Sequence, residues 1–130
     1  MATNPAVPFW DEAESFTCHA SAAVTGKRFV SISGARVDGN PRVASAASSA
    51  TAKPFGVSAY DAASGAKLTV YTKPGLVMPV TASGAITAGA PVFSTADGRA
   101  TATNPGGTGI VAGWAADDAA DGTDAVIKLA

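Results

Sequence analysis

Closely spaced turn residues limit this chain to short structural elements. Between Ser83 and Ala130, Gly, Asn, Asp and Pro separate four runs of strand-forming residues: Pro91–Ser94, Arg99–Thr103, Gly109–Ala115 and Ala125–Leu129. These turn residues reverse a chain at low conformational cost. The last run alternates, with Ala125, Ile127 and Leu129 on one side and Val126 and Lys128 on the other, as in a half-buried strand. The segment therefore predicts a compact β scaffold.

The first part of the chain has the same character. Its expected strands are Phe16–Ala20, Val24–Ser33, Arg42–Ala46, Phe55–Tyr60, Lys67–Thr72 and Leu76–Val80. Asp38-Gly39, inside a turn at 34–41, is a strong hairpin signal, and Pro79 favours a position at a sheet edge. The Ala-rich segment 44–53 lacks an apolar face and is expected to be a loop. We predict an all-β fold, a small sandwich-like or barrel-like (β-tulip-like) domain of short antiparallel strands with long loops.

An internal repeat supports the β prediction. Gly56–Gly65 aligns without gaps on Gly113–Gly122, and Gly26–Ser31 aligns on Gly89–Ser94 further upstream. The order of the matches is preserved, which is how a duplicated unit is recognised. We therefore hypothesise two related β units, at residues 24–72 and 87–130. A common strand order in the two units is the criterion for this hypothesis.

The N-terminal segment has a different composition. Pro5 and Pro8 oppose regular strand pairing, and Phe9 and Trp10 follow as adjacent aromatic residues. We predict an extended arm at residues 1–15 and a single β domain at residues 16–130. The aromatic pair either inserts into a groove of another protein or folds back onto its own domain.

Composition and charge bear on partners. The chain has 30 alanines and 14 glycines, and only 15% of its residues are charged. Small side chains bury little apolar area, so association with another protein would add the missing burial, although a GC-rich coding bias would give the same composition. Residues 1–26, 27–73 and 74–130 carry net charges of −3, +5 and −3. These charges either cancel on one surface or join copies head to tail.

Several functional classes lack support in the sequence. A net charge of −1 argues against nucleic acid as a partner. No apolar run is long enough for a membrane span and the N-terminus does not resemble a signal peptide, so synthesis in the cytoplasm is expected. Cys18 is the one cysteine, so no internal disulfide forms. His19 is the one histidine, and because adjacent strand residues point to opposite faces, Cys18 and His19 are not expected to share a catalytic or metal site. The cluster of Asp117, Asp118, Asp121 and Asp124 is read as a solvated turn rather than a calcium site. We expect no enzyme activity, no cofactor and no metal.

The C-terminal motifs carry a family resemblance. Gly84–Phe93, Asp97-Gly98-Arg99, Gly109–Gly113 and the terminal turn and strand resemble tailed-phage capsid decoration (capsid cement) proteins, over roughly the last 75 residues. The resemblance implies a β domain on the outside of an assembled head that bridges neighbouring major capsid proteins, commonly as a homotrimer. It implies no active site. It also implies a virion location at the outer capsid surface.

Contact residues follow from these expectations. The expected capsid contacts lie in the arm: Pro8, Phe9, Trp10, Asp11 and Glu12. The expected contacts between copies are charged: Lys27, Arg28, Arg36, Arg42, Asp117, Asp118 and Asp121. The alternative function is a carbohydrate- or host-surface-binding β module of a phage fibre or tail. Its candidate aromatic residues are Phe9, Trp10, Tyr60, Tyr71 and Trp114.

Overall fold

The computed structural model describes residues 3–4, 6, 13–45 and 53–130. Its strands are, in chain order, β1 (Ser15–Ala20), β2 (Phe29–Val37), β3 (Asn40–Ser45), β4 (Gly56–Ser58), β5 (Lys67–Tyr71), β6 (Val77–Thr81), β7 (Pro91–Ser94), β8 (Ala100–Thr101), β9 (Gly113–Ala115) and β10 (Asp124–Leu129). A 3₁₀ turn, η1 (Pro105–Gly107), precedes β9. The all-β prediction is confirmed. Most of the expected loop at 44–53 lies outside the described residues.

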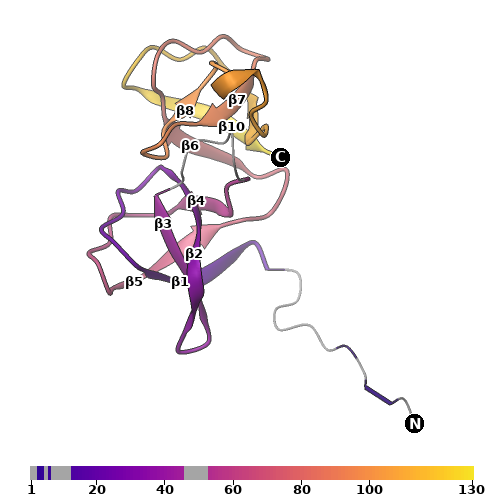
Figure 1. Cartoon of the computed structure of the whole chain (residues 1–130). Helices are drawn as coiled ribbons and strands as arrows, with labels where there is room; N and C mark the ends of the chain where they lie inside the picture. The colour runs from indigo at the N-terminus through magenta and orange to yellow at the C-terminus, as the bar shows by residue number, and fades with distance from the viewer. Residues whose placement is uncertain (1–2, 5, 7–12, 46–52) are drawn as a thin grey trace.

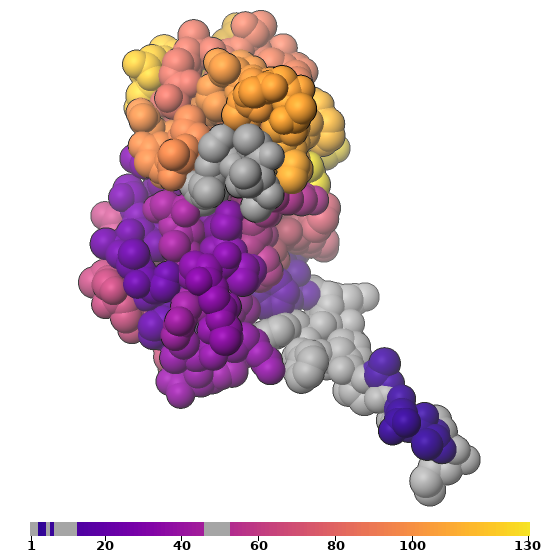
Figure 2. All heavy atoms as spheres, viewed as in Figure 1, coloured from indigo at the N-terminus to yellow at the C-terminus, as the bar shows by residue number. Residues whose placement is uncertain are grey.

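The strands form two stacked halves. Strands β1 to β5 close a barrel in the order β1-β3-β2-β4-β5, which we call the N-terminal barrel. Strands β6 to β10 form a sheet in the order β6-β10-β9-β7-β8, which we call the C-terminal sheet. Figures 1 and 2 show the orange and yellow C-terminal sheet stacked on one end of the barrel. Strand β6, which carries Pro79, lies at the edge of its sheet as the proline predicted.

The two halves share one strand order and one register. Cys18 of β1 pairs with Leu68 of β5, as Val80 of β6 pairs with Ala125 of β10. In the same way, the β2–β4 pairing of residues 30 and 56 matches the β7–β9 pairing of residues 92 and 113. Residues up to β2 therefore correspond to residues of the second half at a shift of 62 (18 to 80, 30 to 92). Residues after the β2–β3 hairpin correspond at a shift of 57 (56 to 113, 68 to 125). The criterion of a common strand order is met.

Barrel closure is where the halves differ. Strands β1 and β3 are parallel, with Ala20 opposite Val43. The corresponding residues of the C-terminal half, Ala82 and Ala100, form a single parallel bridge. The C-terminal sheet is thus the same barrel with its closure reduced to one bridge. The parallel pairing departs from the expected antiparallel strands, because a strand of one alternating pattern can pair in either direction.

The repeat is also longer and differently aligned than the sequence match indicates. Equivalent pairing begins in β1 and β6, one strand before the predicted units at 24 and 87. The sequence match placed Gly26 on Gly89, but the N–H of Lys27 donates to the carbonyl of Ser58 (3.0 Å) as that of Gly89 donates to Ala115 (2.7 Å). Lys27 and Gly89 both have positive φ, 58° and 84°. Lys27 is therefore the structural counterpart of Gly89, and the glycine match was off by one residue.

Several of the expected strands are shorter than predicted. The positive φ of Lys27 interrupts the expected Val24–Ser33 strand, so β2 begins at Phe29 and Val24 forms only a bridge to Ala62. In the C-terminal half, the side-chain oxygen of Asn104 accepts a hydrogen bond from the N–H of Gly109 (2.6 Å) and closes a loop around η1. This loop takes up residues that the patterns assigned to the ends of β8 and the start of β9.

Each half has its own apolar core. The core of the N-terminal barrel comprises Cys18, Ala20, Val24, Val30, Val43, Ala62, Leu68 and Val70. The predicted alternation of β10 is confirmed, since Ala125, Ile127 and Leu129 are buried while Val126 and Lys128 are exposed. Phe29 and Val57 lie on barrel strands, yet they pack in the core of the C-terminal sheet. These two side chains join the halves.

Candidate interaction surfaces

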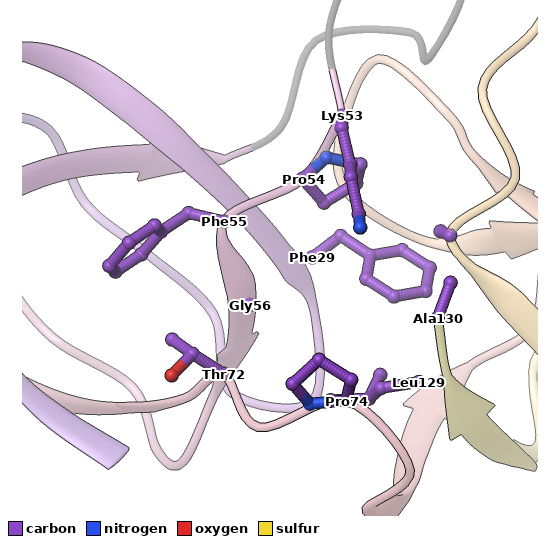
Figure 3. Close-up of a pocket in the computed structure, with 10 residues that line it drawn as sticks. Phe29, Lys53, Pro54, Phe55, Gly56, Thr72, Pro74, Leu129 and Ala130 are labelled. Atoms are coloured by element: carbon purple, nitrogen blue, oxygen red, sulfur yellow. The ribbon is translucent and has the colours of Figure 1, made fainter. Parts of the chain in front are cut away.

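The seam between the halves is a polar rim around Phe29. The N–H of Phe29 donates to the carbonyl of Gly98 (2.7 Å), at the tip of the β7–β8 hairpin. A pocket of about 90 Å³ lies beside it, and Figure 3 shows the Phe29 ring directed toward Ala130 while Phe55 points to the other side of β4. A Cβ on Gly98 would lie 2.4 Å from the Phe29 carbonyl oxygen, so the hairpin tip requires glycine. The halves are in close backbone contact here.

Two of the bases expected between copies pair within this chain. Lys27 Nζ lies 2.7 Å from Asp124 Oδ2, and Arg28 Nη1 lies 3.7 Å from Asp97 Oδ2, both across the seam. The hydroxyl of Thr95 donates to Asp97, and this bond, together with the nearby Arg99 and Arg28, lowers the pKa of the Asp97 carboxyl. Exposed pairs of this kind contribute at most about 1 kcal/mol each. Lys27 and Arg28 therefore help to align the two halves.

The other two predicted bases lie on the long β2–β3 hairpin. Figure 1 shows this hairpin at the end of the barrel away from the C-terminal sheet. Arg36 is exposed, while Arg42 is half-buried opposite Gly34, where an added Cβ would lie 3.2 Å from Arg42 Cδ. The structure thus separates the four predicted bases into a seam pair and a hairpin pair.

The predicted acidic residues hold loops together. Asp118 Oδ1 accepts the N–H of Ala88 and Asp121 Oδ1 that of Gly84, each at 2.8 Å, while Asp117 Oδ1 accepts the N–H of Asp118. In the barrel, Asp61 accepts the N–H of Gly26 at 2.8 Å, in the position that corresponds to Asp118. Hydrogen bonds from loop backbone N–H groups to aspartate side chains therefore explain why three of the four aspartates are clustered here. Within the described ranges, no group of three His, Cys, Asp or Glu side chains is placed to hold a metal ion.

Apolar side chains gather on the outer face of the C-terminal sheet. Trp114, Val126 and Val77 are 47%, 39% and 55% exposed. The register aligns Trp114 with Lys128, which in turn pairs with Val77 on the next strand. Sequence reasoning missed this face as a unit. The outward alternation of β10 indicated Val126 and Lys128, but nothing indicated which strands lie beside them.

A second, open groove lies at the side of the seam. It has a volume of about 440 Å³ and is lined by Thr25, Gly26, Lys27, Ala59, Tyr60, Asp61, Thr81 and Asp124. The Tyr60 ring is 49% exposed, and its hydroxyl accepts the N–H of Thr69 (3.2 Å). The groove thus combines one aromatic ring with two carboxylates and an amine.

Cys18 and His19 point to opposite faces of β1, as expected. Cys18 is fully buried, and burial raises the pKa of its thiol to about 11. The Nδ1 atom of His19 is buried and has no hydrogen-bond partner among the described residues. A thiol with a raised pKa is a poor nucleophile near neutral pH.

Cys18 is therefore expected to resist modification in the folded protein. A thiol reagent at neutral pH should label native protein only as fast as the barrel opens, and denatured protein at the rate of a free cysteine. Mass spectrometry of timed samples measures both rates. Equal rates with and without denaturant would contradict the buried position of the thiol.

The arm contacts Pro8, Phe9, Trp10, Asp11 and Glu12 lie outside the described residues and remain predictions. The part of the chain that the structure describes contains no helix long and apolar enough to cross a membrane.

Comparisons with known proteins agree with the fold. A family model described as phage cement protein matches residues 10–129. Among solved structures, the N base of head fiber gp8.5 of bacteriophage phi29 is similar, with a TM-score of 0.72 and 26% identity over 89% of this chain and 92% of that chain. A search of curated proteins found no match. The resemblance noted from the C-terminal motifs is confirmed and extends over nearly the whole chain: the protein belongs to the phage cement protein family.

Proposed function

We propose that this protein binds the outer surface of an assembled phage head as a homotrimer and stabilises the shell by bridging neighbouring major capsid proteins. The family match over residues 10–129 carries the proposal. Membership of that family supports a structural role at the virion capsid. A protein that binds only the assembled shell stabilises it by mass action, without any chemical step.

The contact residues divide between two kinds of surface. We retain the arm residues Phe9 and Trp10 as the proposed capsid anchor, since adjacent aromatic residues are typical interface anchors. For contacts between copies, the exposed Arg36 and Asp117 are better placed than Lys27 and Arg28, because the latter pair lies at the seam within one chain.

Binding to heads tests the function. Heads of the parent phage assembled without this protein should bind purified protein to saturation, and should then resist heating better than bare heads. Cosedimentation and a thermal assay of DNA release measure the two effects. Phe9→Ala combined with Trp10→Ala should weaken binding by at least tenfold, an effect of about 1.4 kcal/mol. Absence of saturable binding by the unaltered protein would refute the proposal.

The open groove favours one second candidate, a module that binds surface carbohydrate. An exposed aromatic ring beside carboxylates suits a sugar ring and its hydroxyl groups, and here Tyr60 lies beside Asp61 and Asp124. The similarity to a phage head fiber base supports this candidate as well. Glycan-array binding that Tyr60→Ala abolishes would establish it. An array without signal would remove it.

A further inference from the structure

The outer face of the C-terminal sheet is uncovered in one chain. A row of paired residues crosses strands β7, β9, β10 and β6: Pro91, Trp114, Lys128 and Val77. A second pair, Val126 and Pro79, extends the face along β10 and β6. We call these six residues the Trp114 face. All of them are exposed, with Trp114 at 47% and Val77 at 55%.

The corresponding row of the N-terminal barrel is covered at its β2 and β4 positions, while Tyr71 and Ser15, at the positions of Lys128 and Val77, are half-buried. The shifts of 62 and 57 residues place Phe29 at the position of Pro91 and Val57 at that of Trp114. Phe29 is 1% exposed and Val57 is fully buried, because the C-terminal sheet packs over them. The first unit thus uses the Phe29 and Val57 part of this face to bind the unit that follows it. The second unit presents the same face, with a tryptophan at its centre, to solvent.

We propose that a second copy of this chain covers the Trp114 face, through the N-terminal barrel of that copy. The proposal rests on the self-association in the proposed function and assigns a surface to it. Residues 27–73 carry a net charge of +5 and residues 74–130 one of −3. The pairs Lys27–Asp124 and Arg28–Asp97 within one chain remove two charges of each sign, which leaves +3 and −1, still of opposite sign. Contact between unlike surfaces is head-to-tail, and such contacts form closed rings when the rotation permits.

The repeat also indicates where on the barrel the contact falls. Phe29 of the barrel shares a pocket with Ala112 and Leu129 of the C-terminal half, and Phe55 and Thr72 of the barrel also line this pocket. Phe55 and Thr72 are the barrel residues that correspond to Ala112 and Leu129. Phe55 is half-buried and its ring lies 5.7 Å from that of Phe16. Pro91, which corresponds to Phe29, would therefore meet this aromatic pair on the next copy, and the ring of Trp114, its cross-strand partner, would lie beside it.

The molar mass in solution tests the proposal. Wild type should sediment at a multiple of 12.7 kDa at sub-millimolar concentration. Trp114→Lys should raise the dissociation constant by at least about thirtyfold, as loss of a central tryptophan does at interfaces. Ile110→Lys is the matched control, because Ile110 is exposed (38%) in the same half but lies on a loop before β9, and it should keep the wild-type mass. Circular dichroism should show both variants folded.

A separate measurement of binding to phage heads distinguishes a failure of this surface assignment from a failure of the proposed function. A monomeric wild type, or a Trp114→Lys variant that keeps the wild-type mass, overturns the assignment of the face even if both proteins bind heads. A Trp114→Lys variant with unchanged mass and lost head binding assigns the face to the capsid instead, and also overturns the proposal. If wild type binds no heads but Trp114→Lys still dissociates it, the surface assignment stands and the capsid function fails. Should Trp114→Lys be unfolded, Trp114→Ser replaces it with the same expected loss.

Discussion

Replacement of Gly56 by alanine is expected to lower the free energy of unfolding by about 3 kcal/mol or more, the upper range for overpacking a closed site. An added Cβ would lie 2.3 Å from the carbonyl oxygen of Tyr71 and 2.8 Å from Val70 Cγ1, on the neighbouring strand β5. A backbone oxygen cannot move away without breaking the β4–β5 pairing. Urea denaturation followed by circular dichroism measures the loss.

The repeat supplies both a replicate and a control for this experiment. Gly113 corresponds to Gly56, and a Cβ there would lie 2.4 Å from the carbonyl oxygen of Lys128, so Gly113→Ala should cost a similar amount. Gly65 has a φ of 84° but open space around it. Gly65→Ala should therefore cost only the strain of a left-handed residue, about 1–2 kcal/mol. If Gly56→Ala and Gly65→Ala lowered the free energy of unfolding equally, close packing around Gly56 would not be the reason that glycine is required there.

The sequence predicted the strands and turns well because both depend on neighbouring residues. Alternation in β10 predicted which of its side chains are buried, and Pro79 predicted an edge strand. Prediction failed where a distant contact decides the conformation. Lys27 adopts a positive φ within an apparently continuous strand pattern, at the point where its carbonyl accepts the N–H of Thr81 from the other half.

The interaction surfaces were harder to predict for the same reason. The charge segregation is a property of the sequence, but the pairing of Lys27 with Asp124 joins residues 97 positions apart. The aspartates of the C-terminal turn could have been interpreted from the repeat, since Asp61 aligns with Asp118 and makes the corresponding backbone hydrogen bond. The Trp114 face needed the register of four strands, which no local pattern contains.

Phe29 and Val30 provide the sharpest test of the two-core architecture, because adjacent residues of β2 serve different cores. Phe29 packs in the core of the C-terminal sheet and Val30 in that of the barrel. Phe29→Ala should lower the free energy of unfolding by about 3–5 kcal/mol, the range for removal of a buried phenylalanine. Its largest loss of amide protection should fall in β6, β9 and β10, although the mutation lies in the barrel.

Val30→Ala should give the opposite pattern, with the largest loss of protection in β1, β3 and β5. Hydrogen exchange read by mass spectrometry reports both patterns on the full chain. Ile32→Ala is the control on the same strand, because Ile32 is 52% exposed and its truncation should change stability by no more than about 0.5 kcal/mol. If the halves unfolded only as one unit, both core variants would reduce protection equally throughout. That outcome would refute independent opening of the two cores, because each variant would then lower the protection of the whole chain wherever the shortened side chain lies.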